Sequence, residues 1–153
     1  MQAVSASPET DARRAAMAVC AEAQAAELAA ALVRFGELPA VREIRPAETG
    51  LVMLRGRMGG DGAPFNLGEA TVTRAAVEIG SGRTGFAYHL GRDGAKARAA
   101  AILDALWQEP DSRDAVEAAL APVRERLAAQ AEREARRVAA TRVDFFTLVR
   151  GGD

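Results

Sequence analysis

Cysteine, histidine and lysine are almost absent from this chain, which contains one residue of each type: Cys20, His89 and Lys96. A single cysteine excludes an intrachain disulfide. One cysteine and one histidine together cannot supply the ligands of a Cys/His zinc site or the attachment motif of a c-type haem. The cysteine content is typical of an intracellular protein, and we expect a cytoplasmic location.

The sequence also lacks a net charge and a long apolar run. Its 20 Lys and Arg residues nearly balance 21 Asp and Glu, which leaves a formal charge of -1. Such a chain has no overall positive field to hold nucleic acid or an anionic membrane. A transmembrane helix needs about 20 apolar residues in a row, and the sequence contains no such run. We therefore expect neither nucleic acid nor a membrane as a partner.

Arginine, by contrast, is abundant, because all but one of the 20 basic residues are arginines. The guanidinium fork binds carboxylate and phosphate groups in two-pronged geometry. The same composition, rich in alanine and arginine, also follows from a GC-rich coding sequence, so the excess by itself does not establish a binding site. The length of 153 residues suits one domain. We assign residues 1–8 to a disordered N-terminus and residues 9–153 to a single domain.

Helical patterns occupy both ends of the chain. Residues 9–35 are almost all helix formers, with apolar residues spaced for one face and a glycine at the end, and they predict one helix. A second helix is predicted to follow Asp93 as its N-cap and to end near residue 107. Residues 113–140 carry an apolar stripe that predicts one or two further helices, with Pro122 at a first turn or at a kink.

The middle of the chain alternates between apolar and polar residues in a way that predicts β-strands at residues 41–45, 51–58, 66–79 and 83–90. Short connections between consecutive strands favour antiparallel pairing. The sequence therefore predicts an α+β fold: an antiparallel sheet of about four strands with an N-terminal helix and two or three C-terminal helices.

Two of these strands have informative alternation. In the third strand the apolar positions change face near Arg74, which predicts a bulge or bend there. In the fourth strand His89 lies opposite the apolar side. Because no nucleophile or second histidine accompanies it, we interpret His89 as a polar residue of the sheet and not as a catalytic acid or base. The apolar side of this strand consists of Thr84, Phe86, Tyr88 and Leu90.

Residues 80–85 match the Gly-x-Gly-x-x-Gly spacing of a dinucleotide-binding loop. That loop places a pyrophosphate at the N-terminus of a helix, whereas a strand is predicted to follow this segment. We therefore interpret residues 80–85 as a hairpin turn. The sequence contains neither a P-loop nor a nucleophile elbow.

Arginines and glycines near the predicted loop at residues 59–62 form the best local candidate for an anion site. Strand arginines next to backbone amides freed by glycines can bind phosphate or phosphonate oxygens. The alternative is ordinary ion pairing with Glu69, Glu78 or Asp61 around a hairpin turn. The candidate residues are Arg55, Arg57, Gly59, Gly60 and Arg74.

The last segment of the chain, residues 143–149, is unusually apolar for a chain end. Such a segment either returns to the sheet of its own domain or docks on another protein. We predict that it is a partner interface formed by Phe145, Phe146, Leu148 and Val149.

Four blocks of sequence, in unbroken order, resemble one protein family. The longest is residues 57–77, which contains the Gly-Gly-Asp-Gly loop, and the others are residues 47–52, residues 85–93 with 102–106, and residues 141–151. Together these blocks resemble the PhnG family, whose members are subunits of the bacterial carbon-phosphorus lyase complex. The first 26 residues match nothing distinctive.

The resemblance implies a role in phosphonate catabolism, which supplies phosphorus. It implies a core complex with PhnH, PhnI and PhnJ, to which the ATPase-type subunits PhnK and PhnL attach. With PhnH, PhnI and PhnL, a PhnG-like subunit is required for synthesis of alpha-D-ribose 1-methylphosphonate 5-triphosphate, in which the phosphonate displaces adenine from MgATP. PhnJ, a radical SAM iron-sulfur protein, later cleaves the carbon-phosphorus bond. A chain with one cysteine cannot hold an iron-sulfur cluster and is not that catalyst.

For this chain the resemblance implies a subunit of a transferase complex that is inactive alone. We expect it to bind no cofactor or metal by itself and to contain no catalytic residue, with MgATP as the substrate of the assembled complex. Because the related nucleosidase activity belongs to PhnI, we hypothesise that the chain supports or completes a site on PhnI. The alternative is a purely structural adaptor without ligand contact.

Overall fold

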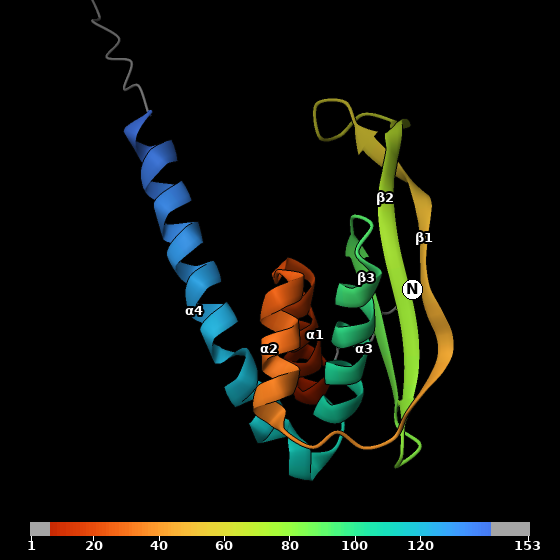
Figure 1. The fold of residues 1–153 in the computed structure, drawn as a ribbon. Coiled ribbons are helices and arrows are strands. Elements are labelled where there is room, and N and C mark those ends of the chain that lie inside the picture. The colour runs from red at the N-terminus through yellow and green to blue at the C-terminus, as the bar shows by residue number, and fades with distance from the viewer. Residues whose placement is uncertain (1–6, 142–153) are drawn as a thin grey trace, which may run out of the picture.

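The computed structural model describes residues 7–141 of the chain (Figure 1). Helices lie on one face of a single antiparallel sheet with the strand order β1-β2-β3, and no described helix covers the other face. The predicted α+β class is confirmed. The elements are α1 (Pro8–Glu22), α2 (Ala25–Phe35), β1 (Val41–Arg57), β2 (Pro64–Ile79), β3 (Thr84–Leu90), α3 (Gly94–Trp107) and α4 (Pro110–Ala140).

The N-terminal helical region is two helices, α1 and α2, and the prediction of one helix over residues 9–35 was wrong. Side chains from later elements bind the carbonyls at the end of α1. Lys96 Nζ donates a hydrogen bond to the Ala21 carbonyl at 2.6 Å, and Arg126 Nη2 donates one to the Glu22 carbonyl at 3.3 Å. Because these partners satisfy groups that a continuous helix would pair internally, the break depends on the tertiary structure. Local helix propensity does not reveal it.

The start of α2 is anchored to α4 by Glu27. Its carboxylate accepts a hydrogen bond from the Gln24 backbone N–H at 2.8 Å, and Arg126 of α4 donates to both of its oxygens at 2.5 and 2.9 Å. The hydrogen bonds from Arg126 are the main reason that the pKa of Glu27 lies below its ordinary value. One residue therefore caps α2 and links it to the last helix.

Within residues 7–141 the sheet has three strands, because the predicted strands at residues 41–45 and 51–58 are one strand, β1. β1 pairs with β2 along its whole length, but the register shifts twice on its first half, between Glu43 and Arg45 and between Arg45 and Glu48. These irregularities accommodate Pro46, which has no N–H to donate to a ladder. Pro46 therefore bends an edge strand without ending it.

The pairing is irregular near Arg74, but the irregularity lies in β1 and not in the third strand, where a bulge or bend was predicted. β2 pairs with β3 residue for residue from Val72 to Glu78, and the irregular residues lie in β1 opposite. Thr73, not Val72, continues the face that packs against the helices. Its buried hydroxyl donates to the Gly91 carbonyl at 2.7 Å and lies 3.0 Å from the Thr49 hydroxyl. A satisfied threonine thus occupies a position where the sequence pattern predicted an apolar residue.

The core surrounds α3, which contacts all three strands and the other three helices. Ten of its 14 residues are buried, as expected for a helix at the centre of the core. α3 lies so close to β3 that a Cβ atom at Gly85 would be 1.9 Å from the Ala101 carbonyl oxygen. Only glycine fits at that crossing.

α4 packs against the body of the protein from its start to about Leu127. Val116 and Val123 are buried, whereas Val138, part of the predicted apolar stripe, is exposed. α4 is a single helix with Pro122 inside it, and its second half projects away from the other helices (Figure 1). Although α4 is the longest element, neither it nor any other described helix combines the length and hydropathy of a membrane span.

Candidate interaction surface

Arg74, one of the predicted anion-binding residues, is ion-paired on the face of the sheet that no described helix covers, which we call the open face. Its Nε donates to Glu48 Oε1 at 2.6 Å, and Arg45 Nη1 donates to the same oxygen at 2.6 Å. These hydrogen bonds, first from Arg45 and then from Arg74, hold the pKa of Glu48 below its ordinary value. Arg74 therefore pairs with Glu48 of β1. It does not pair with Glu69, Glu78 or Asp61, the partners considered in the alternative interpretation.

Arg55 and Arg57 lie elsewhere. Alternation along β1 places both on the face opposite Glu48 and Arg74, and Arg55 is separated from Glu48 by about 23 Å along the strand. Arg57 Nη1 donates to the Gly62 carbonyl at 3.1 Å. The structure therefore does not bring all three predicted arginines to one anion. Anion binding by Arg55 and Arg57 stays a prediction.

Gly59 and Gly60 form the turn between β1 and β2. Both have positive φ, 64° and 86°, and the Gly62 N–H donates to the Met58 carbonyl at 3.0 Å. Such backbone angles favour glycine. The glycines are therefore explained by the turn itself, and their predicted part in an anion site stays a prediction.

His89 is buried against the helices at the end of β3. Its Nδ1 lies 2.9 Å from the Leu90 carbonyl oxygen and its Nε2 lies 3.2 Å from the Asp93 carbonyl oxygen. The ring thus links the end of β3 to the residue that caps α3. This position agrees with the interpretation of His89 as a polar residue of the sheet.

Within residues 7–141, no group of three or more His, Cys, Asp or Glu side chains is arranged to hold a metal ion. Cys20 lies in the core, where burial raises the pKa of its thiol to about 12. A thiol in this environment is neutral at physiological pH and unreactive.

We predict that Cys20 of the native protein reacts with a thiol reagent at pH 8 at least about 100-fold more slowly than in the unfolded chain. The pKa of the Cys20 thiol in the folded protein lies above its value in the unfolded chain, which is about 8.5. The contribution of the neutral thiol to stability is therefore fully present below about pH 8.5. It is lost progressively as the pH rises towards 12. Absorbance of a released chromogenic thiolate measures the reaction, and complete labelling of the native protein within minutes would contradict the buried position.

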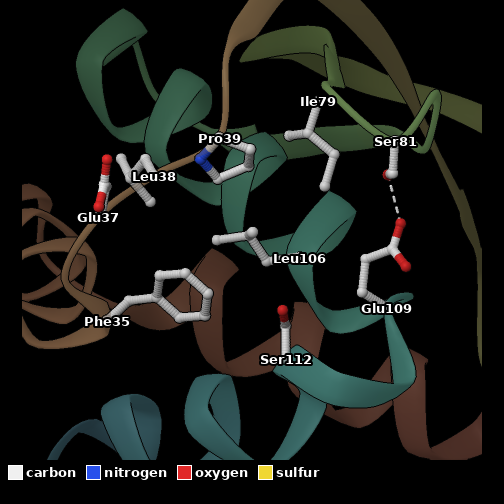
Figure 2. A pocket seen from close by; sticks show the side chains of 9 residues that line it. All are labelled: Phe35, Glu37, Leu38, Pro39, Ile79, Ser81, Leu106, Glu109 and Ser112. Carbon is white, nitrogen blue, oxygen red and sulfur yellow. Dashed lines mark hydrogen bonds between the residues drawn. The ribbon is translucent and has the colours of Figure 1, made fainter.

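A cleft of about 450 Å³ lies where α2, β2, α3 and α4 approach one another (Figure 2). Its walls are mostly apolar. On one side the Glu109 carboxylate accepts a hydrogen bond from the Ser81 hydroxyl and lies 3.5 Å from Arg83 Nε. The cleft has the size and polarity for an aliphatic or aromatic side chain. Sequence reasoning missed it because three separate stretches of the chain build it: Phe35, Glu37, Leu38, Pro39, Ile79, Ser81, Leu106, Glu109 and Ser112.

The apolar side of β3 faces away from the helices. Phe86, Tyr88 and Leu90 are 57%, 57% and 72% exposed, whereas Gly85 and Ala87 face α3. The alternation was predicted correctly, but the apolar side lies on the open face, because α3 leaves no room for a side chain at position 85. In register with Tyr88, the Arg74 and Glu48 ion pair crosses the same face. The open face is therefore apolar at β3 and charged towards β1.

Side chains of α3 and of its C-cap residue bind the first part of the outer edge of β3. Asp104 Oδ2 accepts a hydrogen bond from the Phe86 N–H at 2.8 Å, and Gln108 Nε2 donates to the Thr84 carbonyl at 2.8 Å. Arg13 of α1 holds the Asp104 carboxylate from the other side through two hydrogen bonds of 2.7 Å. The first part of β3 is thus protected from pairing with a further strand.

β1 and β2 continue beyond the end of β3 as a two-stranded hairpin (Figure 1). We call residues 49–70 the arm. Several large apolar side chains of the arm are exposed: Leu51, Met53, Leu54, Met58, Phe65 and Leu67. Exposed apolar groups gathered on one element mark an interaction site more often than single ones do.

The other predicted interface lies outside the described residues. It consists of Phe145, Phe146, Leu148 and Val149. Its role as a partner anchor stays a prediction.

Comparisons with known proteins agree with the resemblance seen in the sequence. The model of a family described as phosphonate metabolism protein PhnG matches residues 11–151. A protein of Rhizobium meliloti (strain 1021), named alpha-D-ribose 1-methylphosphonate 5-triphosphate synthase subunit PhnG, is 51% identical over 141 residues, which cover 92% of this chain and 90% of that protein. The chain therefore belongs to the PhnG family of phosphonate metabolism proteins.

Proposed function

We propose that this chain is a subunit of a complex that synthesises alpha-D-ribose 1-methylphosphonate 5-triphosphate. The observation that carries the proposal is the 51% identity, over nearly the whole length of both chains, to a protein named as that subunit. In the reaction implied by the family, the phosphonate displaces adenine from MgATP. MgATP is then a substrate of the assembled complex, and the chain itself binds no cofactor.

The proposed partners are PhnH, PhnI and PhnL for this synthesis, together with PhnJ and PhnK in the larger assembly, in the cytoplasm. Exposed apolar side chains on the arm and on the open face of the sheet support a role in assembly. Burial of such side chains between subunits is favourable by about 25 cal/mol per Å² of apolar surface. In this role the chain supports or completes a site on PhnI.

A purely structural adaptor is the second candidate. The ion pair between Arg74 and Glu48 favours it, because an engaged guanidinium has fewer N–H groups to offer a phosphate. The two candidates differ in kinetics. Once assembly is secured, an adaptor leaves the reaction insensitive to substitution of its surface arginines.

We predict that the purified chain, mixed with MgATP and methylphosphonate, releases no adenine above background. Adenine release should appear when the other subunits are added, and a mixture of those subunits without this chain should be inactive. Chromatographic measurement of adenine tests all three mixtures. Robust turnover by the chain alone would contradict the proposal, and so would full activity of the mixture that lacks it.

A further inference from the structure

We propose that the arm inserts into an apolar cleft of another subunit, where the edge of β1 from Thr49 to Leu54 pairs with a strand of that subunit. This inference rests on the proposed function, because it names the surface through which the subunit assembles. Four observations support it: the apolar pattern of the arm, its unprotected edge, the lower suitability of the other sheet edges for strand addition, and two arginines that form no ion pair among the described residues.

The apolar pattern of the arm is that of a strand covered on both faces. Leu51, Val52, Met53 and Leu54 form a continuous apolar run, whereas a strand with one wet face alternates. In the structure Leu51 and Met53 on one face are 59% and 53% exposed, and Leu54 on the other face is also exposed. A two-stranded hairpin is marginally stable in water by itself. The sequence is thus suited to an enclosure that the described part of the chain does not provide.

Protection of the β1 edge stops where the arm begins. The first half of β1 carries the charged residues of the open face, Pro46 and two register shifts, which are the devices that natural sheets use against pairing with another chain. From Thr49 to Leu54 the pairing with β2 is regular, and the segment contains no proline and no charge. This part of β1 is a regularly paired, uncharged and apolar edge, which is the type of edge that accepts a further strand.

The other edges of the sheet are less suitable for the addition of a strand. Side chains of Asp104 and Gln108 already bind the backbone at the first part of the β3 edge. The edge of β2 in the arm begins at Pro64 and is interrupted by a register shift that leaves Leu67 without a partner in β1. Strand addition is therefore expected on β1.

The charges of the arm point to a partner that offers carboxylates. Among the described residues, Arg55 and Arg57 form no ion pair, although both lie just beyond the apolar run. A second copy that pairs through the same edge is a poor occupant, because antiparallel pairing of residues 49–54 with themselves places Arg55 opposite Glu48, whose carboxylate is engaged. Glu43 is paired with Arg98 at 2.8 Å, and Glu48 is held by two arginines. We therefore infer a different subunit, with an apolar cleft and acidic residues at its mouth.

Lysines on the arm test the proposal. Leu51→Lys/Met53→Lys is expected to reduce co-purification with the other subunits of the complex at least about 10-fold, because lysine on an edge strand opposes strand addition. The matched control is Val33→Lys/Val138→Lys, which alters two exposed apolar residues outside the arm and should assemble like the wild type. All four side chains are exposed, so the thermal unfolding of the free variants should stay close to that of the wild type.

Hydrogen exchange tests strand pairing directly and needs no substitution. Backbone amides of residues 49–54 that point away from β2 should exchange at least about 100-fold more slowly in the complex than in the free chain. Equal exchange in the two states would overturn the proposal. Normal assembly of Leu51→Lys/Met53→Lys would overturn it as well while leaving the proposed function intact. Failure of the wild type to assemble would instead contradict the proposed function, and the arm proposal with it.

Two further outcomes identify the occupant. Arg55→Glu/Arg57→Glu should weaken assembly. If this variant assembles normally but the complex loses activity, the inference that carboxylates of the partner bind these arginines is wrong and the arginines bind an anion instead. Light scattering on the free chain should find a monomer. A dimer that Leu51→Lys/Met53→Lys dissociates would show that a second copy occupies the arm and would overturn the inference of a different subunit.

Discussion

Gly85→Ala is expected to lower the free energy of unfolding by about 3 kcal/mol, at the upper end of the usual cost of an overpacked core. The added Cβ would lie 1.9 Å from the Ala101 carbonyl oxygen, 2.5 Å from the Ala105 backbone nitrogen and 2.8 Å from the Ala105 Cβ. Two of these atoms belong to the α3 backbone and cannot rotate away as a long side chain would. β3 must therefore move off the helix, which opens the core around α3.

Gly50→Ala is the matched control, because Gly50 is also a strand glycine but has no atom within 4 Å of the position that a Cβ would occupy. This substitution should be neutral or stabilising by up to about 1 kcal/mol, since it restricts the unfolded chain. Urea unfolding followed by circular dichroism compares the two variants. Equal stabilities would mean that the contact between β3 and α3 is looser than the structure shows.

Asp104→Ala is expected to destabilise the fold by about 3 kcal/mol, because it removes one partner of a buried ion pair. Asp104 is 1% exposed, accepts two hydrogen bonds from Arg13 and also accepts the Phe86 backbone N–H. The substitution leaves that N–H without its acceptor. Arg13 is partly exposed and can turn to water, which keeps the expected cost at the lower end of the range for buried pairs.

Two variants give this prediction its controls. Asp104→Asn keeps an oxygen for the Phe86 N–H and should lie between the wild type and Asp104→Ala. Asp11→Ala removes an exposed ion pair with Arg14 and should cost less than about 1 kcal/mol. Chemical denaturation gives all three values. A loss below about 1 kcal/mol for Asp104→Ala would mean that the link between α1, α3 and β3 contributes little to stability.

These two predictions concern the same junction, which determines the character of the open face. α3 approaches β3 closely enough to require glycine at position 85, and Asp104 binds the backbone of Phe86. The large apolar side chains of β3 are therefore left on the side away from the helices. If the proposed function holds, this packing inside the monomer is what makes Phe86, Tyr88 and Leu90 available to another subunit.

The candidate site was only partly predictable. The arginines and glycines of the predicted anion site were chosen from their proximity along the chain, but strand alternation separates Arg74 from Arg55 and Arg57. The exposed apolar run of the arm was visible as a strand, yet its exposure depends on where β3 ends. The cleft in Figure 2 had no sequence signal, because its lining comes from segments far apart in the chain.

The amino-acid sequence alone determined the class of fold, the position of most helices and strands, and the family. These follow from local periodicity, turn residues and ordered sequence blocks, which need no knowledge of distant contacts. Only the tertiary structure decided where the first helix breaks, that Pro46 lies inside one long strand, and which face of β3 is covered. Each of these depends on residues distant in sequence: Lys96 and Arg126 at the end of α1, β2 beside Pro46, and α3 against Gly85.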